Sequence, residues 1–272
     1  VRLIRFRLLT DFDMNYLKEI GMSKPDVKGK VVVVAGGGKN LGGLISQEFA
    51  KEGAKIVAHY HSDSSKAEAE ATVDAILATG GEAVTFQGDL SKADNVTALF
   101  DFAKSTYGGI DIAVNTVGKV LRKPIVETSE ADYDSMFDVN SKTAYFFIKE
   151  AGKQLNNNGK IITIVTSLLA AFTDGYSTYA GGKAPVEHFT RAAAKEFSGR
   201  GISVTGIGPG PMDTPFFYGE ETPERVAFHK SQAMGNQLTQ IEDIVPIVKF
   251  LATDGWWITG QTIFANGGYT TR

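Results

Sequence analysis

The sequence predicts an α/β fold, in which one domain is built on a doubly wound parallel sheet of about seven strands flanked by helices. Three observations support this prediction. Apolar runs of strand length alternate with amphipathic segments of helix length from about residue 30 onward. After its first residue, the run KVVVVA at 30–35 is apolar on both faces, as in a strand buried between two helical layers. A glycine-rich segment follows it directly, where the chain must turn from strand to helix.

Each element is predicted from its own pattern. Leu44, Ile45, Phe49 and Ala50 recur at helical spacing after the glycine-rich turn and predict a helix over 41–52. Further strands are predicted at 55–60, 83–87, 111–115, 160–166, 202–207 and 261–265. Further helices are predicted at 65–78, 93–107, 130–155 with a break near Asp138, 179–198 and 242–252. In such a sheet the ligand lies beyond the carboxyl ends of the strands, so the loops after the strands should carry the site.

The composition excludes several classes of function. The net charge is −3 and no block of basic residues occurs, so no nucleic-acid partner is expected. The chain has no cysteine, which excludes disulfides and thiol nucleophiles. The histidines show no HxxH or HExxH spacing, so we expect no metal. No apolar run approaches the ~20 residues of a membrane span, and we expect a cytoplasmic protein without a membrane partner.

The chain is expected to form one catalytic domain. Residues 1–28 are assigned to an N-terminal extension, because residues 1–9 alternate arginine with apolar residues and lack a signal-peptide core. Residues 29–272 are assigned to a single dinucleotide-binding domain. Within it, residues 216–240 are rich in Phe, Tyr, Met and Gln and should form a mobile lid over a substrate. The residues expected to line an apolar pocket are Phe216, Phe217, Tyr218, Phe228 and Met234, with Leu168, Leu169 and Phe172 opposite them. The alternative for the lid is an ordinary surface helix.

The segment YSTYAGGK at 176–183 places Tyr179 and Lys183 on one face of a helix, if it is helical. An ammonium group beside a phenol favours the phenolate. A free tyrosine titrates near pH ~10, and lowering its pKa by ~3 units takes about 4 kcal/mol. Taken alone, the pair is better explained as a solvated lysine beside a half-buried tyrosine than as a catalytic pair. Two glycines and Pro185 are poor helix formers, so the first turn is expected to be kinked, which would shift Lys183 relative to Tyr179.

The glycine-rich turn and the features after it resemble the short-chain dehydrogenase/reductase family, whose members share a Rossmann-type fold. That family carries Thr-Gly-x-x-x-Gly-x-Gly at this turn. Gly36 and Gly42 match, whereas Ala35 replaces the threonine and Asn40 the middle glycine. Asparagine adopts left-handed backbone conformations more readily than most residues, so the turn should still form. The backbone there would approach a pyrophosphate at the start of the following helix.

The resemblance also implies the catalytic residues. Ser167, at the end of the fifth strand, matches the catalytic serine, and Thr166 is the second choice. Tyr179 and Lys183 match the proton-transfer pair, and Asn140 matches the family's helix asparagine, which would position a water that relays protons to Lys183. By the same resemblance, the enzyme is a homotetramer or dimer, with the Tyr179 helix and the C-terminal strand at its interfaces.

Further matches extend the resemblance over about residues 28–270. Asp89 matches the residue that contacts the adenine ring, Asn115 to Gly118 match the segment after the fourth strand, and 209–214 match the segment beside the nicotinamide. Residues 266–268 match the C-terminal glycine turn. The cofactor contacts expected in all are Gly36, Lys39, Asn40, Leu41, Gly42, Tyr60, His61, Ser62, Asp89, Leu90, Asn115, Val117, Gly118, Tyr179, Lys183, Pro209, Gly210, Met212 and Thr214.

Each match also has a plainer explanation. Asp89 could cap the next helix, Asn115 could bridge strand backbones, and Asn140 could cap or break a helix. Ser167 could be an ordinary loop hydroxyl, and the Pro-Gly at 209–210 only a turn. Because all of them occur in order, each on its expected element, the functional interpretation is favoured over these separate ones.

The cofactor is expected to be NADP(H). An acidic residue at the end of the second strand usually binds the ribose hydroxyls of NAD and repels a 2′-phosphate. Tyr60 stands at this position, and Lys39 lies in the glycine loop. Lys39, with His61 and Ser62, could hold a 2′-phosphate by charge-assisted hydrogen bonds. In the alternative, Lys39 is only solvated and Asp63 turns inward to select NAD.

These features predict an NADPH-dependent carbonyl reductase that reduces a ketone to a secondary alcohol, or the reverse. Tyr179 would donate the proton, and Ser167 would hydrogen-bond the same oxygen. The first alternative is a 3-oxoacyl thioester reductase, although Arg122, Lys123 and Arg225 form no evident docking patch for a carrier protein. The others are a catalytically silent NADP-binding sensor or scaffold and a structural oligomer subunit.

Overall fold

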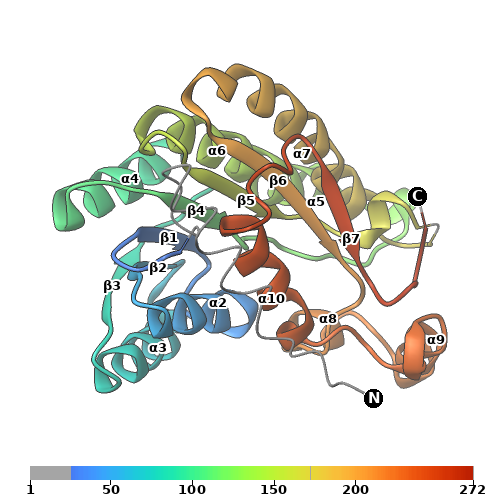
Figure 1. Ribbon diagram of the computed structural model, residues 1–272. Helices are drawn as coiled ribbons and strands as arrows, with labels where there is room; N and C mark the ends of the chain where they lie inside the picture. Colours follow the sequence, from blue (N-terminus) through green and yellow to red (C-terminus); the bar gives the residue numbers. More distant parts are fainter. Residues whose placement is uncertain (1–25, 172, 272) are drawn as a thin grey trace, which may run out of the picture.

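The computed structural model describes residues 26–171 and 173–271. The expected extension at 1–28 lies almost wholly outside the described residues, as does Phe172. The described residues form a seven-stranded sheet in the order β3-β2-β1-β4-β5-β6-β7, and all neighbouring strands are parallel (Figure 1). The strands are β1 (Val31–Ala35), β2 (Lys55–Tyr60), β3 (Glu82–Gln87), β4 (Ile112–Asn115), β5 (Lys160–Ile164), β6 (Ser203–Pro209) and β7 (Thr262–Ala265). The predicted fold class is confirmed.

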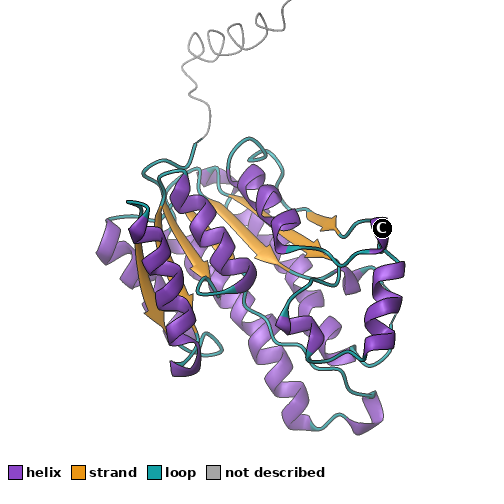
Figure 2. Cartoon of the chain, turned by 90° about the horizontal axis from the view of Figure 1, so that it is seen from below, coloured by secondary structure: helices purple, strands orange, loops and turns teal. Residues whose placement is uncertain are grey.

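Helices cover both faces of the sheet (Figure 2). They are α2 (Asn40–Lys51), α3 (Lys66–Ala78), α4 (Ala93–Tyr107), α5 (Glu130–Phe137), α6 (Thr143–Gln154), α7 (Ser177–Glu196), α8 (Pro215–Tyr218), α9 (Pro223–Ser231) and α10 (Ile241–Ala252). The predicted bounds differ from these by one or two residues at most ends. No helix of the described part of the chain is long and apolar enough to cross a membrane.

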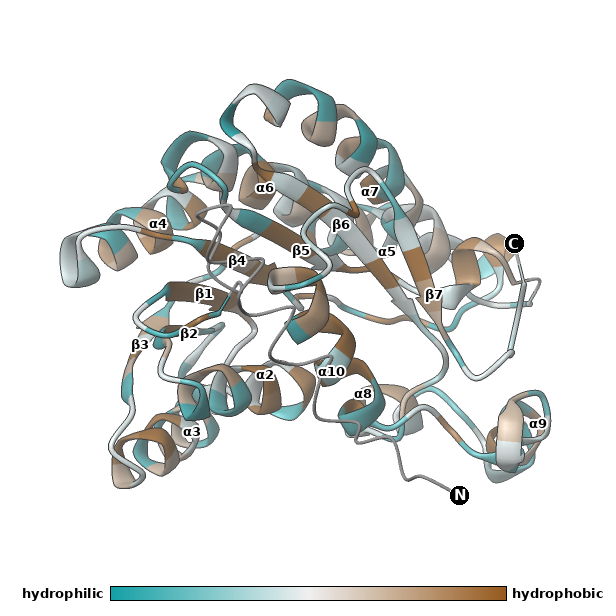
Figure 3. Cartoon of the chain, viewed as in Figure 1, coloured by the Kyte–Doolittle hydropathy of each residue, from teal (hydrophilic) through white to brown (hydrophobic). Residues whose placement is uncertain are grey.

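Two hydrophobic cores lie on opposite faces of the sheet, because successive strand residues point to opposite sides. On one face, Val32 and Val34 pack with Ile45 and Phe49 of α2 and with α10. On the other face, neighbouring strand residues pack with α4, α6 and α7. Figure 3 accordingly shows β1 as hydrophobic along its length. The unbroken apolar run in β1 is therefore explained by burial on both sides.

The predicted break near Asp138 is a π-helical turn, Asp138–Lys142, which joins α5 to α6. A π-turn widens the helix locally and is common at functional sites. It carries Asn140, whose side chain is buried. The break is confirmed, and it places a polar side chain beneath the loop that follows β4.

The helix α7 differs from the expectation at its start. It begins at Ser177 and continues as one helix through Pro185, which lies well past the first turn. Pro185 therefore lies in the interior of α7, beyond its first turn, and the expected kink and the shift of Lys183 stay predictions. Gly181 precedes Pro185 by four residues. A proline inside a helix normally clashes with the carbonyl group of the residue four positions before it, and it has no N–H to donate to that carbonyl. Tyr179 and Lys183 both lie before Pro185, in the regular part of the helix.

Candidate active site

A cavity of about 430 Å³ opens at the carboxyl ends of the central strands, and we call it the central cavity. The predicted residues that line it are Gly36, Lys39, Asn40, Leu41, Gly42, Tyr60, His61, Asp89, Leu90, Val117, Gly118, Tyr179, Lys183, Met212 and Thr214. Ser167, Pro209 and Gly210 line a smaller neighbouring cavity. Asn115, Asn140 and Ser62 lie outside both linings. The structure thus brings most of the predicted site together at one edge of the sheet.

The glycine-rich turn has the backbone that close approach of a ligand requires. Gly36 has a φ of 76° and Asn40 a φ of 47°, so both are left-handed, as expected for Asn40. A Cβ atom on Gly42 would overlap the carbonyl oxygen of Gly36. The helix α2 begins at Asn40 and directs its free N–H groups at the central cavity. Side chains larger than glycine would fill this hollow. Its shape and its N–H groups fit the pyrophosphate of a dinucleotide.

His59 is a site residue that the sequence interpretation missed. Its Nδ1 accepts a hydrogen bond of 3.0 Å from the backbone N–H of Gly36, and its Nε2 lies 2.7 Å from the carbonyl oxygen of Gly88. The imidazole is therefore neutral, with its proton on Nε2. Burial lowers the pKa of His59 to about 4, which keeps it in this form. His59 joins the loops after β1 and β3 into one wall of the central cavity.

Two predicted residues shape their own loops. The Oδ1 of Asn115 accepts from the backbone N–H of Val117 at 3.0 Å. Asp89 accepts from the backbone N–H of Ser91 at 3.0 Å, and it does not cap α4, which begins later. Burial acts to raise the pKa of Asp89, but its hydrogen bonds from Ser91 outweigh burial and lower it. Asn115 therefore fixes backbone geometry, while the Asp89 carboxylate also faces the central cavity.

At the corner expected to bind a 2′-phosphate, Asp63 is not part of the cavity lining. Asp63 accepts a hydrogen bond of 3.0 Å from Gln87, which holds it to β3. Tyr60 lines the cavity and donates from its hydroxyl to Gln87 at 3.1 Å. Lys39 lies 2.6 Å from Glu68, and both side chains are about half exposed, so this pair is weak and open to exchange. The arrangement leaves a cation beside the cavity and ties Asp63 elsewhere.

Tyr179 and Lys183 are brought together on α7, and both are buried at the wall of the central cavity. Burial raises the pKa of Tyr179 to about 12, while a side-chain hydrogen bond with Thr166 acts in the opposite direction. Burial lowers the pKa of Lys183 to about 8. Lys183 donates to the carbonyl oxygens of Ile164 at 3.0 Å and Val117 at 3.2 Å. One of its three protons is left for another partner.

The hydroxyl beside Tyr179 belongs to Thr166, the second choice of the sequence interpretation. Ser167 is buried and donates its hydroxyl proton to the carbonyl oxygen of Gly208 at 3.0 Å. Thr166 instead accepts from the backbone N–H of Leu168 at 3.2 Å, so its own proton is available. The order of the two candidates is therefore reversed. Adjacent residues leaving a strand point in different directions, and only the fold decides which one faces the helix.

Asn140 and Gly118 form the wall next to Lys183. The amide nitrogen of Asn140 donates to the carbonyl oxygens of Lys119 at 2.8 Å and Met136 at 3.0 Å. Its Oδ1 accepts from the backbone N–H of Lys119 at 3.1 Å. A Cβ atom on Gly118 would lie 3.2 Å from the Nζ of Lys183 and 3.3 Å from the Oδ1 of Asn140. Asn140 thus fastens the loop that follows β4, and its expected role in a water relay stays a prediction.

A smaller cavity of about 80 Å³, the inner cavity, adjoins the central cavity. Tyr179, Met212, Thr214 and Phe216 line both cavities. The hydroxyl of Thr214 is buried and has no hydrogen-bond partner among the described residues. A buried polar atom without a partner is costly, so this wall is suited to a polar group of a bound molecule, such as a nicotinamide amide.

The segment 216–240 covers the inner cavity, but only part of it lines the cavity. Phe216 and Phe217 face inward, and the ring centroid of Phe216 lies 6.2 Å from that of Tyr179. Tyr218, Phe228 and Met234 are 42%, 56% and 80% exposed, so the prediction that they line the pocket is wrong. Leu168 lines the cavity, whereas Leu169 packs against α6 and α7. The mobility of this segment stays a prediction.

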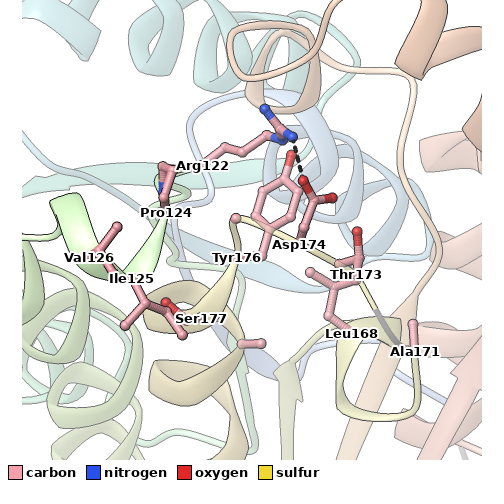
Figure 4. Close-up of a pocket in the computed structure, with 12 residues that line it drawn as sticks. Arg122, Pro124, Ile125, Val126, Leu168, Ala171, Thr173, Asp174, Tyr176 and Ser177 are labelled. Carbon is pink, nitrogen blue, oxygen red and sulfur yellow. Dashed lines mark hydrogen bonds and ion pairs between the residues drawn. The ribbon is translucent and has the colours of Figure 1, made fainter.

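A third hollow, the outer pocket, lies against the other side of Tyr176 and Leu168 (Figure 4). Exposed Ile125 and Val126 form one rim. Arg122 and Asp174 form a 3.0 Å ion pair at another, as the dashed line in Figure 4 marks. Because Tyr176 and Leu168 line both hollows, they form a partition between the outer pocket and the inner cavity.

Known proteins match nearly the whole described domain. A family model described as enoyl-(acyl carrier protein) reductase matches residues 36–270. A chloroplastic NADPH-dependent aldehyde reductase-like protein from Arabidopsis thaliana is 35% identical over 254 residues, covering 89% of this chain and 94% of the relative. A hydroxynaphthalene reductase-like protein from Metarhizium majus is 35% identical over 259 residues, covering 89% and 96%.

Solved structures agree with the fold. A dehydrogenase from Burkholderia cenocepacia, solved with bound NADP, superimposes with a TM-score of 0.90 at 58% sequence identity. The match covers 94% of this chain and 98% of that one. The fold of this chain is therefore shared with a protein whose structure was solved with bound NADP.

Proposed function

The chain belongs to the short-chain dehydrogenase/reductase family of oxidoreductases, and from this premise we propose that it is an NADPH-dependent carbonyl reductase. It reduces a ketone to a secondary alcohol, and the reaction is reversible. The observation that carries this proposal is the buried, protonated Tyr179 beside the hydroxyl of Thr166, where the central and inner cavities meet. Such paired hydroxyls suit a reacting oxygen.

The cofactor is NADP(H). The relative from Arabidopsis thaliana is named as NADPH-dependent, and the Burkholderia cenocepacia structure holds NADP. In this chain, the glycine cradle at Gly36 and Gly42 fits a pyrophosphate, and Asp89 lies where the adenine would bind. Lys39 provides the cation for a 2′-phosphate, and Asp63 is tied to Gln87 rather than turned toward the ribose. Thr214 and Lys183 would hold the nicotinamide end.

When bound, NADPH supplies the hydride for the carbonyl carbon. The protein's own groups manage the charge on the oxygen. Tyr179, kept as a phenol by burial, donates its proton to that oxygen as the general acid. Thr166 donates a second hydrogen bond to the same atom, which stabilises developing negative charge. Lys183 has a third proton besides those that bond to Ile164 and Val117, and its positive charge would counter part of the rise in pKa that burial causes at Tyr179.

The first test replaces single hydroxyls. Tyr179→Phe removes the proton donor, and we expect kcat for ketone reduction to fall at least about 100-fold while NADPH still binds. Ketone reduction near the wild-type rate would sink the assignment. Thr166→Ala should lower kcat by about 10²-fold, as for the loss of one oxyanion donor. Ser167→Ala is the matched control, because its hydroxyl bonds to Gly208 instead, and it should change kcat far less.

The 3-oxoacyl thioester alternative is disfavoured by charge. A carrier protein would need free basic side chains near the site. Arg122 pairs with Asp174 at 3.0 Å, Lys123 with Asp132 at 2.7 Å, and Arg225 with Glu221 at 2.8 Å. Each of these cations already has a carboxylate partner within the described structure. A silent sensor or scaffold would have no need of the paired hydroxyls and the buried lysine.

The proposal includes a homo-oligomer, a dimer or tetramer. Tyr145 of α6 is 50% exposed and stacks edge-on with Phe189 of α7 at 5.1 Å, which leaves an aromatic surface over these helices. Trp257, before the edge strand β7, is 80% exposed. Exposed aromatic groups of this size often mark interfaces. A monomer in sedimentation velocity would contradict this part of the proposal.

A further inference from the structure

The inner cavity has a polar wall as well as an apolar one. We call Tyr176, Glu221, Arg225, His229 and Tyr269 the polar cluster; Tyr176, Glu221, His229 and Tyr269 line the cavity. The side chain of Glu221 is fully buried and that of His229 is 3% exposed. These residues come from the start of α7, from α9 and the turn before it, and from the C-terminal turn after β7. None of them was predicted as a site residue.

The partners within the polar cluster fix where its protons lie. Glu221 accepts from the hydroxyl of Tyr176 at 2.5 Å, from Arg225 at 2.8 Å and from His229 at 3.1 Å. Burial acts to raise the pKa of Glu221, but these hydrogen bonds outweigh burial and lower it, so the carboxylate is ionised. An ionised carboxylate only accepts hydrogen bonds. The Nε2 of His229 must therefore carry a proton that it donates to Glu221.

The same reasoning extends to Tyr269. With its proton on Nε2, a neutral His229 has an unprotonated Nδ1, which lies 2.8 Å from the Tyr269 hydroxyl. In that neutral state Tyr269 donates its proton to His229, and Tyr176 donates its proton to Glu221 in either charge state of the ring. Ser167, in the same cavity wall, donates to the carbonyl of Gly208. The hydroxyl protons of Tyr176, Tyr269 and Ser167 thus point into the protein, and the lone pairs of Tyr176 and Tyr269 are left for a ligand.

A wall of acceptors selects for a donor. A substrate hydroxyl placed there forms a hydrogen bond, whereas a carboxylate or a second carbonyl meets only lone pairs and loses its hydration. A plain methyl group leaves the tyrosine oxygens unpartnered, which also costs binding. The cavity of about 80 Å³ holds about five to eight water-sized groups, so the substrate portion inside it is small.

We propose that the polar cluster makes this protein selective for hydroxycarbonyl compounds, in which a hydroxyl group lies a few bonds from the carbonyl that is reduced. Tyr269 and Tyr176 accept the hydrogen bond from that hydroxyl. Glu221 and His229 act as positioning residues, because they hold the protons of the two tyrosines away from the substrate. This inference rests on the proposed function and names its substrate class.

The test is a panel of matched substrates with the wild-type enzyme and NADPH. Three triplets differ only in the terminal group: hydroxyacetone, 2-butanone and pyruvate; 4-hydroxy-2-butanone, 2-pentanone and acetoacetate; and 5-hydroxy-2-pentanone, 2-hexanone and 4-oxopentanoate. At one spacing or more, kcat/KM should be about tenfold or more higher for the hydroxyl than for the methyl compound. The carboxylate should be the poorest member. Methoxyacetone controls for electronic activation, because it keeps the oxygen and lacks the donor.

Two single variants test whether the polar cluster causes the preference for hydroxyl compounds. Tyr269→Phe should bring the ratio of kcat/KM for the hydroxyl and methyl compounds toward one. Tyr218→Phe is the matched control, since its hydroxyl bonds to Asp213 on the exposed side of the lid, and it should leave the ratio unchanged. Equal rates for hydroxyl and methyl ketones at all three spacings would overturn the inference but leave the carbonyl reductase intact. No NADPH oxidation with any member of the panel would instead overturn the proposed function.

Discussion

The two cavities of the site are held together in different ways. Around the central cavity, buried side chains bond to the backbone: His59 to the loops after β1 and β3, and Asn140 to the loop after β4. Around the inner cavity, side chains bond to side chains, with Glu221 as the common acceptor. Backbone-directed bonds fix the shape of the loops around the central cavity, which suits the constant shape of the proposed cofactor. A side-chain network sets which groups line the inner cavity, and a single substitution can change it.

The largest effect is expected where the backbone of the central cavity is blocked. Gly42→Ala would drive a Cβ atom into the carbonyl oxygen of Gly36 and distort the cradle. We expect NADPH binding to weaken at least about 100-fold in a fluorescence titration. The control is Gly199→Ala, because a Cβ atom there meets nothing within 4 Å. Unchanged binding in Gly42→Ala would mean that the turn is not the pyrophosphate site.

The next effect is a pH dependence of stability that arises from His59 at the central cavity. His59 has a pKa of about 4 in the folded protein, against an ordinary value of 6.5. Between these values the unfolded chain binds more protons, so the free energy of unfolding falls as the pH is lowered from 6.5 to 4, and stability is fully present above that range. The shift corresponds to about 3 kcal/mol.

Urea unfolding at pH 6.5 and pH 4 measures this loss. His59→Gln keeps one donor and one acceptor without a titrating ring, so it should lose about 3 kcal/mol less than the wild type between the two pH values. His188→Gln, on the exposed face of α7, serves as the control and should behave as the wild type. An equal loss in His59→Gln would contradict the role of His59 in joining the two loops.

The smallest of the three effects is expected at the substrate side. Glu221→Gln keeps the shape of the side chain but weakens the charged hydrogen bonds to Tyr176, Arg225 and His229, each worth about 1.5–3 kcal/mol. We expect KM for a hydroxyketone to rise about tenfold, with the Kd for NADPH changed less than about twofold. A parallel loss of NADPH affinity would show that the two cavities are not held independently.

Much of the fold could be predicted from the sequence because its signals are local. The buried run at β1, the helical spacing in α2 and the break near Asp138 each depend on residues that lie close in the chain. The left-handed conformation of Asn40 follows from its own side chain and the motif around it. The effect of Pro185 on α7 could not be predicted in the same way, because an interior proline removes one backbone hydrogen bond and the surrounding packing decides how the helix adapts.

The candidate site divides in the same way. Tyr179 and Lys183 lie on one helix, so their spacing alone placed them together. The choice between Thr166 and Ser167 depends on how the end of β5 packs against α7. The side chains of these neighbouring residues are both hydroxyls, but they point in different directions. His59 gave no signal because its partners, Gly36 and Gly88, contribute backbone groups that are the same in every residue.

The sequence by itself determined the sheet, the glycine-rich turn, the placing of Tyr179 beside Lys183 and the family resemblance, because each depends on short segments with fixed spacing. Only the tertiary structure decided which hydroxyl faces Tyr179, what holds the loops of the central cavity, and which atoms line the inner cavity. Tyr176, Glu221, His229 and Tyr269 meet because α7, the lid and the end of the chain converge on one cavity. Hydrogen bonds between such distant segments depend on the packed fold, and no spacing along the chain encodes them.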